Sequence, residues 1–107
     1  GGESSLQVEA MLGFARRAGA LAVGTGATIG ALEKGKAVLL LVSQDASPRT
    51  WEKINAQRGE IPLVRYGRKE ELGKEIGWSG DVAVLAVTQA HFAQNILRLT
   101  ERKGLGE

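Results

Sequence analysis

Two continuous apolar runs organise this chain. Residues 38–42 and 82–87 are aliphatic without polar alternation, which is typical of central strands that are covered on both faces of a sheet. Residues 61–66 predict another strand, and Pro62 at its start favours an edge or entry position. The short apolar link 21–23 fits a further short strand.

Segments with helical spacing of apolar residues lie between these runs. This spacing predicts helices over residues 5–18, 48–57, 68–76 and 89–102, and a shorter one between Gly24 and Gly35. In the first and last helices we expect these residues to face the core: Leu6, Val8, Met11, Leu12, Phe14 and Ala15, then Phe92, Ile96 and Leu99. Helices that alternate with strands through short connections predict an α/β fold, a three-layer α/β/α sandwich around a mainly parallel or mixed sheet.

The short helix between the first two strand candidates is the first place to look for function. Thr25 can cap it, and Gly35 can take the left-handed conformation that ends it. Its first turn has free N–H groups and the positive end of a dipole, which favour a phosphate or another anion. The alternative is an ordinary capped helix. The glycines match neither phosphate-loop pattern, which argues against nucleotide binding.

Composition excludes several classes of protein. The 107 residues make one domain, expected over 5–103 with flexible termini at 1–4 and 104–107. The chain has no cysteine and one histidine, His91, so it lacks the ligands of a transition-metal cluster. No long apolar stretch or signal peptide is present, so we expect a cytoplasmic protein with no membrane contact.

Charge is unevenly distributed although the formal net charge is only +2. Basic residues concentrate in one part of the chain: Arg49, Lys53, Arg58, Arg65, Arg68, Lys69 and Lys74. Residues 75–97 contain no lysine or arginine. The basic segment fits either a nucleic-acid-binding patch or a solvated surface of mixed charge.

An enzyme is not indicated by the side chains present. Asp45 follows a strand, where catalytic carboxylates often lie, but no nucleophile or second carboxylate joins it. A turn-forming aspartate is the simpler interpretation. Glu70 and Glu71 are adjacent, so on a helix they point in different directions. We therefore expect no catalytic residues, no metal and no cofactor.

Five strings, taken in order, resemble the ribosomal protein L7Ae/L30e superfamily, and within it the small bacterial YlxQ-type proteins. They are residues 12–19 (LGFARRAG), 24–35 with the strand that follows, 45–47 (DAS), 66–77 with Tyr66-Gly67 and LGKEIG, and 84–93 with VLAVT and Phe92-Ala93. The resemblance covers residues 6 to about 100.

This resemblance implies an α/β/α sandwich with a four-stranded mixed sheet and RNA binding without catalysis. Members typically bind kink-turn or similar structured RNA through the helix after the first short strand, and a loop before the last strand holds a flipped-out base. Kink-turn binders generally carry Asn, Glu and Lys on that helix, and the matching positions here are Gly26, Ala27 and Gly30. Glycine and alanine offer no group that reaches a base edge.

The first hypothesis is a non-enzymatic RNA-binding protein of the translation or transcription machinery, acting as a monomer. It would recognise ribosomal or other structured RNA by shape and phosphate contacts. The candidate RNA-binding residues are Gly24, Thr25, Gly26, Ala27, Thr28, Gly30, Lys34, Asp45, Ser47, Trp78 and Ser79. Trp78 fits two roles, a stacking platform for an unpaired base or a cover for the end of the core.

The alternative is a protein-interaction module that docks through the helix face of Gly26 and Gly30, with kink-turn binding lost. These glycines and Lys34 share one stripe at i, i+4 and i+8. Two interior glycines cost about 1 kcal/mol each relative to alanine, so a bare backbone surface suggests a close approach by a partner.

Overall fold

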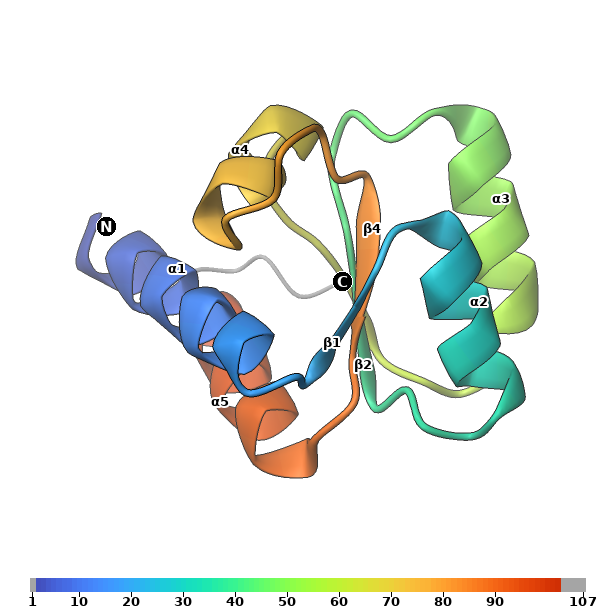
Figure 1. Ribbon diagram of the computed structural model, residues 1–107, viewed down its shortest axis with the longest axis horizontal. Helices are drawn as coiled ribbons and strands as arrows, with labels where there is room; N and C mark the ends of the chain where they lie inside the picture. Colours follow the sequence, from blue (N-terminus) through green and yellow to red (C-terminus); the bar gives the residue numbers. More distant parts are fainter. Residues whose placement is uncertain (1, 103–107) are drawn as a thin grey trace.

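The structure is a computed structural model that describes residues 2–102 (Figure 1). Nine elements follow one another: α1 (Gly2–Arg17), β1 (Leu21–Val23), α2 (Thr25–Glu33), β2 (Leu39–Val42), α3 (Pro48–Gln57), β3 (Leu63–Arg65), α4 (Lys69–Glu75), β4 (Val84–Val87) and α5 (Ala90–Arg102). Residues 1 and 103–107, which include most of the termini expected to be flexible, lie outside the described residues.

The four strands form one mixed sheet in the order β1-β4-β2-β3. β4 pairs antiparallel with both β1 and β2, and β2 pairs parallel with β3. The two continuous apolar runs are thus the two central strands, as predicted, and both are buried along their whole length. The strand that follows Pro62 lies at an edge, also as predicted.

Helices cover both faces of the sheet, which confirms the three-layer sandwich. α1, α4 and α5 lie on one face, and α2 and α3 on the other (Figure 1). Alternate residues of one strand serve different cores, because successive side chains of a strand point to opposite faces. Leu39 and Leu41 pack with α1, α4 and α5, whereas Leu40 and Val42 pack on the side of α2 and α3.

Several local predictions are confirmed by the backbone. Gly19 and Gly35 follow α1 and α2 with φ angles of 73° and 70°, the left-handed conformation expected of helix terminators. Ser47 caps α3 by accepting a hydrogen bond from the N–H of Thr50 at 3.2 Å, and Pro48 is the first helical residue.

Other details differ from the sequence prediction. α1 begins at Gly2 rather than near residue 5, and β4 is shorter than the apolar run 82–87. The N–H of Val82 bonds to Lys69 O at 2.9 Å, so that residue lies along α4 and does not pair in the sheet.

Phe14 is not a core residue, contrary to prediction, because its side chain is 51% exposed. Val8, Leu12 and Ala15 form the buried face of α1, and Phe14 lies about 200° around the helix from Leu12. Leu6 lies outside the residues whose side chains are described. None of the helices, within residues 2–102, has the length and apolar character needed to cross a membrane.

Candidate nucleic-acid interface

Most of the candidate residues lie at one end of the strands, where the sheet meets the loops. The pairing registers place the ends of β1, β2 and β3 beside the start of β4, since Val23 is opposite Leu85, and Val42 is opposite both Val84 and Arg65. We call this the loop edge; it is at the top of Figure 1. α2, α3 and α4 all begin here, and the loop from α4 ends here (Figure 1).

The first turn of α2 lies at the loop edge. The cap residue is Gly24, with φ 95° and ψ 166°, and not Thr25 as expected from the sequence. Thr25 is already the first helical residue. The positive φ of the cap position is one that glycine adopts without strain, which explains the glycine at position 24. The first N–H groups of any α-helix lack an intrahelical partner, and no side chain among the described residues caps those of α2. Gly26 and Ala27 are exposed in this turn.

Backbone hydrogen bonds hold the cap of α2 and the end of β2 beside the start of β4. The N–H of Gly24 donates to Val84 O at 2.9 Å, and the N–H of Ser43 donates to Ala83 O at 2.8 Å. The start of α2 therefore lies next to the point where the α4–β4 loop ends and β4 begins.

Asp45 and Ser47 also lie at the loop edge, and both already stabilise helix starts. Asp45 Oδ1 accepts a hydrogen bond from the N–H of Lys69, the first residue of α4, at 2.8 Å. Its Oδ2 lies 3.7 Å from Nη2 of Arg68. Partial burial tends to raise the pKa of Asp45, but the hydrogen bond from Lys69 and the charge of Arg68 contribute to a net pKa below its usual value.

Thr28 does not face solvent, unlike its neighbours in α2. Its side chain is fully buried, and Oγ1 donates to Ala22 O at 3.4 Å. This bond ties the helix to β1, so the Thr28 hydroxyl has a partner inside the protein and is not available to RNA in this conformation.

Gly30 and Lys34 lie further along α2, toward the opposite end of the sheet. They line an open groove of about 430 Å³ between α2 and β1. The lining residues are Gly19, Leu21, Ala22, Ala27, Gly30, Ala31, Lys34, Lys36 and Thr88. A small residue at position 30 keeps this groove open, and two exposed lysines stand at it.

Trp78 and Ser79 are separated from α2 by the sheet. They follow α4, where the N–H of Trp78 donates to Gly73 O at 2.8 Å. The Trp78 ring is 43% exposed and lies under the guanidinium of Arg16 in α1, 4.7 Å from Cζ to the ring centroid. The structure thus divides the candidate residues into a group at the loop edge, a groove along α2 and a loop against α1.

Two arginines at the loop edge were named in the sequence analysis only as members of the basic segment, and not among the candidate RNA-binding residues. Arg49 in the first turn of α3 and Arg68 just before α4 are both exposed there. Their positions in the sequence could have indicated this, because each lies at the start of a predicted helix that follows a predicted strand.

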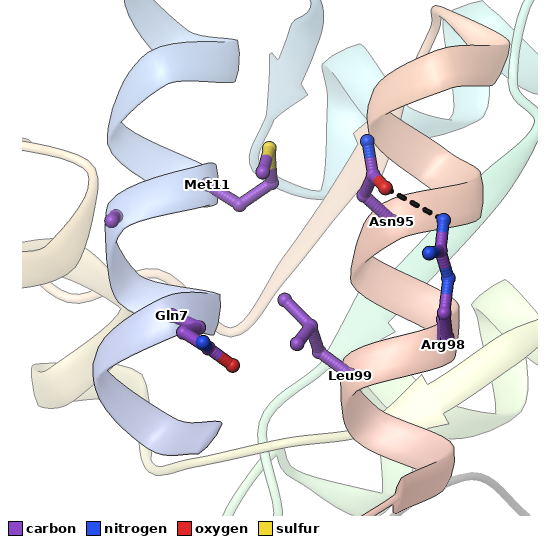
Figure 2. A pocket seen from close by; sticks show the side chains of 6 residues that line it. Gln7, Met11, Asn95, Arg98 and Leu99 are labelled. Carbon is purple, nitrogen blue, oxygen red and sulfur yellow. Dashed lines mark hydrogen bonds between the residues drawn. The ribbon is translucent and has the colours of Figure 1, made fainter. Parts of the chain in front are cut away.

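A separate hollow of about 330 Å³ lies between α1 and α5 and contains none of the candidate residues. Figure 2 shows Met11 of α1 and Leu99 of α5 projecting into the space between the two helices, with Gln7 one turn along α1 from Met11. Nη2 of Arg98 donates to Oδ1 of Asn95 at 2.8 Å, so these two polar groups satisfy each other. Among the described residues, no three His, Cys, Asp or Glu side chains gather as a metal site.

Comparison with known proteins adds to this geometry. Residues 7–97 match the model of the ribosomal protein L7Ae/L30e/S12e/Gadd45 family. The chain is 30% identical over 93 residues to the RNA-binding protein YlxQ of Bacillus subtilis, covering 85% of this chain and 92% of that protein. It is 33% identical over 73 residues to an RNA-binding protein of Geobacillus thermodenitrificans, covering 66% of this chain and 89% of the relative.

Solved structures show the same fold. A protein of unknown function from Bacillus halodurans superposes with a TM-score of 0.83 at 29% identity, covering 88% of this chain and 96% of that one. The 15.5kD RNA binding protein of Giardia lamblia superposes with a TM-score of 0.76 over 94% of this chain and 87% of its own, at 19% identity.

Proposed function

Since this chain belongs to the ribosomal protein L7Ae/L30e/S12e/Gadd45 family, we propose that it is a non-enzymatic RNA-binding protein that recognises structured RNA at the loop edge. The observation that carries the proposal is the uncapped first turn of α2, held beside the α4–β4 loop by the bond from Gly24 to Val84. Relatives at 30% identity or more are named RNA-binding proteins, which supports the same function.

The recognition we propose depends on the backbone and on shape. The N–H groups of Thr25, Gly26 and Ala27 are donors for phosphate oxygens, and the helix dipole favours negative charge at this end. Exposed Arg49 adds positive charge at the same edge, and the exposed guanidinium of Arg68 lies there as the partner of Asp45. Because Gly26 and Ala27 carry no group that reaches a base edge, phosphate contacts dominate and affinity falls steeply as salt rises.

Ribosomal or translational RNA is the proposed target, with the protein acting as a cytoplasmic monomer. The family description names ribosomal proteins, which supports this setting. Co-sedimentation with ribosomal subunits at low salt tests it. Failure to sediment with them, together with binding to a kink-turn RNA in isolation, would move the target outside the ribosome.

A direct test of the function compares a labelled kink-turn RNA with a matched straight duplex at two salt concentrations. We expect the parent protein to bind the kink-turn RNA more tightly, with a strong salt dependence. The triple variant Gly26→Asn, Ala27→Glu, Gly30→Lys restores the side chains typical of kink-turn binders and should increase the preference for the kinked RNA. Equal affinity for both RNAs in parent and triple variant would contradict recognition of structured RNA at α2.

The same titration separates RNA binding from the alternative of protein docking through Gly26 and Gly30. Gly30→Lys adds a cation to the α2 groove, where nothing beyond the chain neighbours and the backbone of α2 lies within 4 Å of the position a β-carbon would take. Because Gly30 lies along α2 beyond the loop edge, the added cation should leave RNA binding unchanged or strengthen it, whereas a bulky charged side chain there would obstruct a close protein contact. A loss of RNA affinity in Gly30→Lys would count against the proposed interface.

A further inference from the structure

Two large apolar side chains are exposed within the described part of the chain, and each is paired with an arginine. Phe14 is 51% exposed and Trp78 is 43% exposed. The guanidinium of Arg17 lies 5.0 Å from the Phe14 ring centroid, and that of Arg16 lies 4.7 Å from the Trp78 ring centroid. A ring face pairs electrostatically with a cation, so each pair forms a flat, positively charged platform.

These two pairs belong to one continuous surface where α1 and α4 end. Nη1 of Arg16 donates to Ile76 O, the C-cap of α4, at 2.8 Å. A β-carbon built at Gly13 would lie 3.4 Å from Nη1 of Arg17 and 3.7 Å from Glu75 O, so the end of α4 packs against α1 at Gly13, next to Arg17. We call Phe14, Arg16, Arg17 and Trp78 the aromatic–arginine surface.

The positions around α1 agree with this contact. At 100° per residue, Arg16, Gly13, Arg17 and Phe14 occupy adjacent positions on one side of the helix. The buried residue Leu12 lies outside this arc, on the core face. The face that α1 turns away from the core near its end is therefore the one that carries the aromatic–arginine surface.

Its chemistry is unlike that of the loop edge. The loop edge offers backbone donors, whereas this surface offers aromatic rings and guanidinium planes, groups on which unpaired bases stack. Arg17 is exposed and has no ion-pair partner among the described residues, which leaves it for a phosphate. Lys74 adds a third cation beside Trp78, where Glu70 and Asp81 also line a hollow of about 180 Å³.

We propose that the aromatic–arginine surface binds an unpaired RNA segment, with bases stacked on Trp78 and Phe14 and phosphates bound by Arg17. The inference rests on the proposed RNA-binding function, but it concerns a surface on the opposite side of the sheet from α2. A structured RNA at the loop edge and a single-stranded flank at this surface would be bound by one domain.

The test measures binding of a short, unstructured, labelled pyrimidine RNA at low salt. Arg17→Glu should weaken this binding by roughly tenfold, because it removes a phosphate contact and adds a repulsive charge. Arg98→Glu makes the same charge change on α5 and should alter the affinity by less than about twofold. Equal losses in the two variants would overturn the proposal, since the binding would then follow net charge alone.

Stacking is tested separately at Trp78. Trp78→Phe should retain most of the affinity, while Trp78→Leu, which keeps an apolar side chain without a ring, should lose roughly tenfold. Thermal melting of both variants checks that the fold is intact. Equal affinities of the Phe and Leu variants, or no binding of the unstructured RNA by the parent, would refute the proposal and point to a protein partner for this surface.

Failure of this proposal is distinguishable from failure of the proposed function. Arg17→Glu should leave the preference for kink-turn RNA over duplex unchanged, because the loop edge is intact in this variant. If the parent binds the unstructured RNA in the predicted manner but does not prefer kink-turn RNA over duplex, the proposal for the aromatic–arginine surface is supported and the function proposed for the loop edge is wrong.

Discussion

Gly73 in α4 lies so close to the carbonyl oxygen of Gly80 that a β-carbon at residue 73 would overlap it. The α4–β4 loop folds back along the helix at this point, with the N–H of Trp78 bonded to Gly73 O at 2.8 Å. The same loop ends beside Gly24 at the loop edge. The close approach of two glycines therefore determines where the loop carries Trp78 and where it meets α2.

Gly73→Ala should destabilise the fold by about 1–3 kcal/mol, because the added methyl group forces the loop away from α4. Urea unfolding measures the change. Gly26→Ala is the matched control, since nothing beyond its chain neighbours and the backbone of its own helix lies within 4 Å of its β-carbon position, and the residue is inside a helix. It should be neutral or stabilise by up to about 1 kcal/mol. Equal effects of the two substitutions would show that the loop adapts to a side chain at residue 73.

Asp45 is predicted to act on stability through its acceptor oxygen more than through its charge. Asp45→Ala removes the hydrogen bond to the N–H of Lys69 and should lower the melting temperature. Asp45→Asn keeps a carbonyl oxygen in the same place and should melt between alanine variant and parent. Identical melting of the Asn and Ala variants would instead assign the effect to the ion pair with Arg68.

The fold could be predicted from the sequence because the apolar runs, the helical spacing of apolar residues and the glycines at the helix ends all indicated the same order of elements. The apolar runs 38–42 and 82–87 contain the two central strands, and glycines at the helix ends marked the turns. Phe14 was misplaced because it lies within a helical apolar pattern whose buried face is already complete with Val8, Leu12 and Ala15.

The candidate site was harder to predict than the fold. Sequence position placed Gly24 and Asp45 on loops, but their neighbours come from segments distant in the chain: Val84 for the first, Lys69 for the second. The resemblance indicates that Trp78 lies in the loop before the last strand, but not that its ring packs against Arg16 on the other side of the sheet from α2. Contacts of this kind depend on how the loops fold against distant segments, and the local pattern of apolar and polar residues does not indicate this.

Glu75 should make stability depend on pH. Burial is the main cause that raises the pKa of Glu75 from its usual 4.5 to about 7. The hydroxyl of Tyr66, which donates to Oε1 of Glu75 at 3.2 Å, lowers this pKa, whereas the negative charges of Glu9 and Glu71 raise it further. A carboxyl whose pKa is raised on folding favours the folded state when protonated. Its stabilising contribution is complete below pH 4.5 and is lost as the pH rises through about 7.

Melting temperatures measured across this range test the effect. As Glu75 ionises, the melting temperature of the parent should fall between pH 4.5 and about 7. Because Gln stays neutral, the melting temperature of Glu75→Gln should change less over this range and should exceed that of the parent above pH 7. Glu52→Gln removes an exposed carboxylate from α3 and serves as the control. Parallel profiles for the parent and Glu75→Gln would mean that Glu75 does not titrate in this range.

Ser47 allows stability and RNA binding to be separated at one position of the loop edge. Its Oγ accepts from the N–H of Thr50, so Ser47→Ala should cost about 1 kcal/mol of stability. Ser47→Asp keeps an acceptor at the cap and should be close to the parent in urea unfolding, because a carboxylate is favoured at a helix start.

The two Ser47 variants should have the opposite order in RNA binding. Ser47→Asp places a negative charge where RNA phosphates are proposed to bind, so kink-turn affinity should fall by roughly fivefold, about 1 kcal/mol, and recover as salt is raised. Ser47→Ala should bind nearly as well as the parent at a temperature where it is fully folded. If Ser47→Asp binds as tightly as Ser47→Ala, the RNA does not approach the start of α3, and the loop edge must be reduced to α2 and the α4–β4 loop.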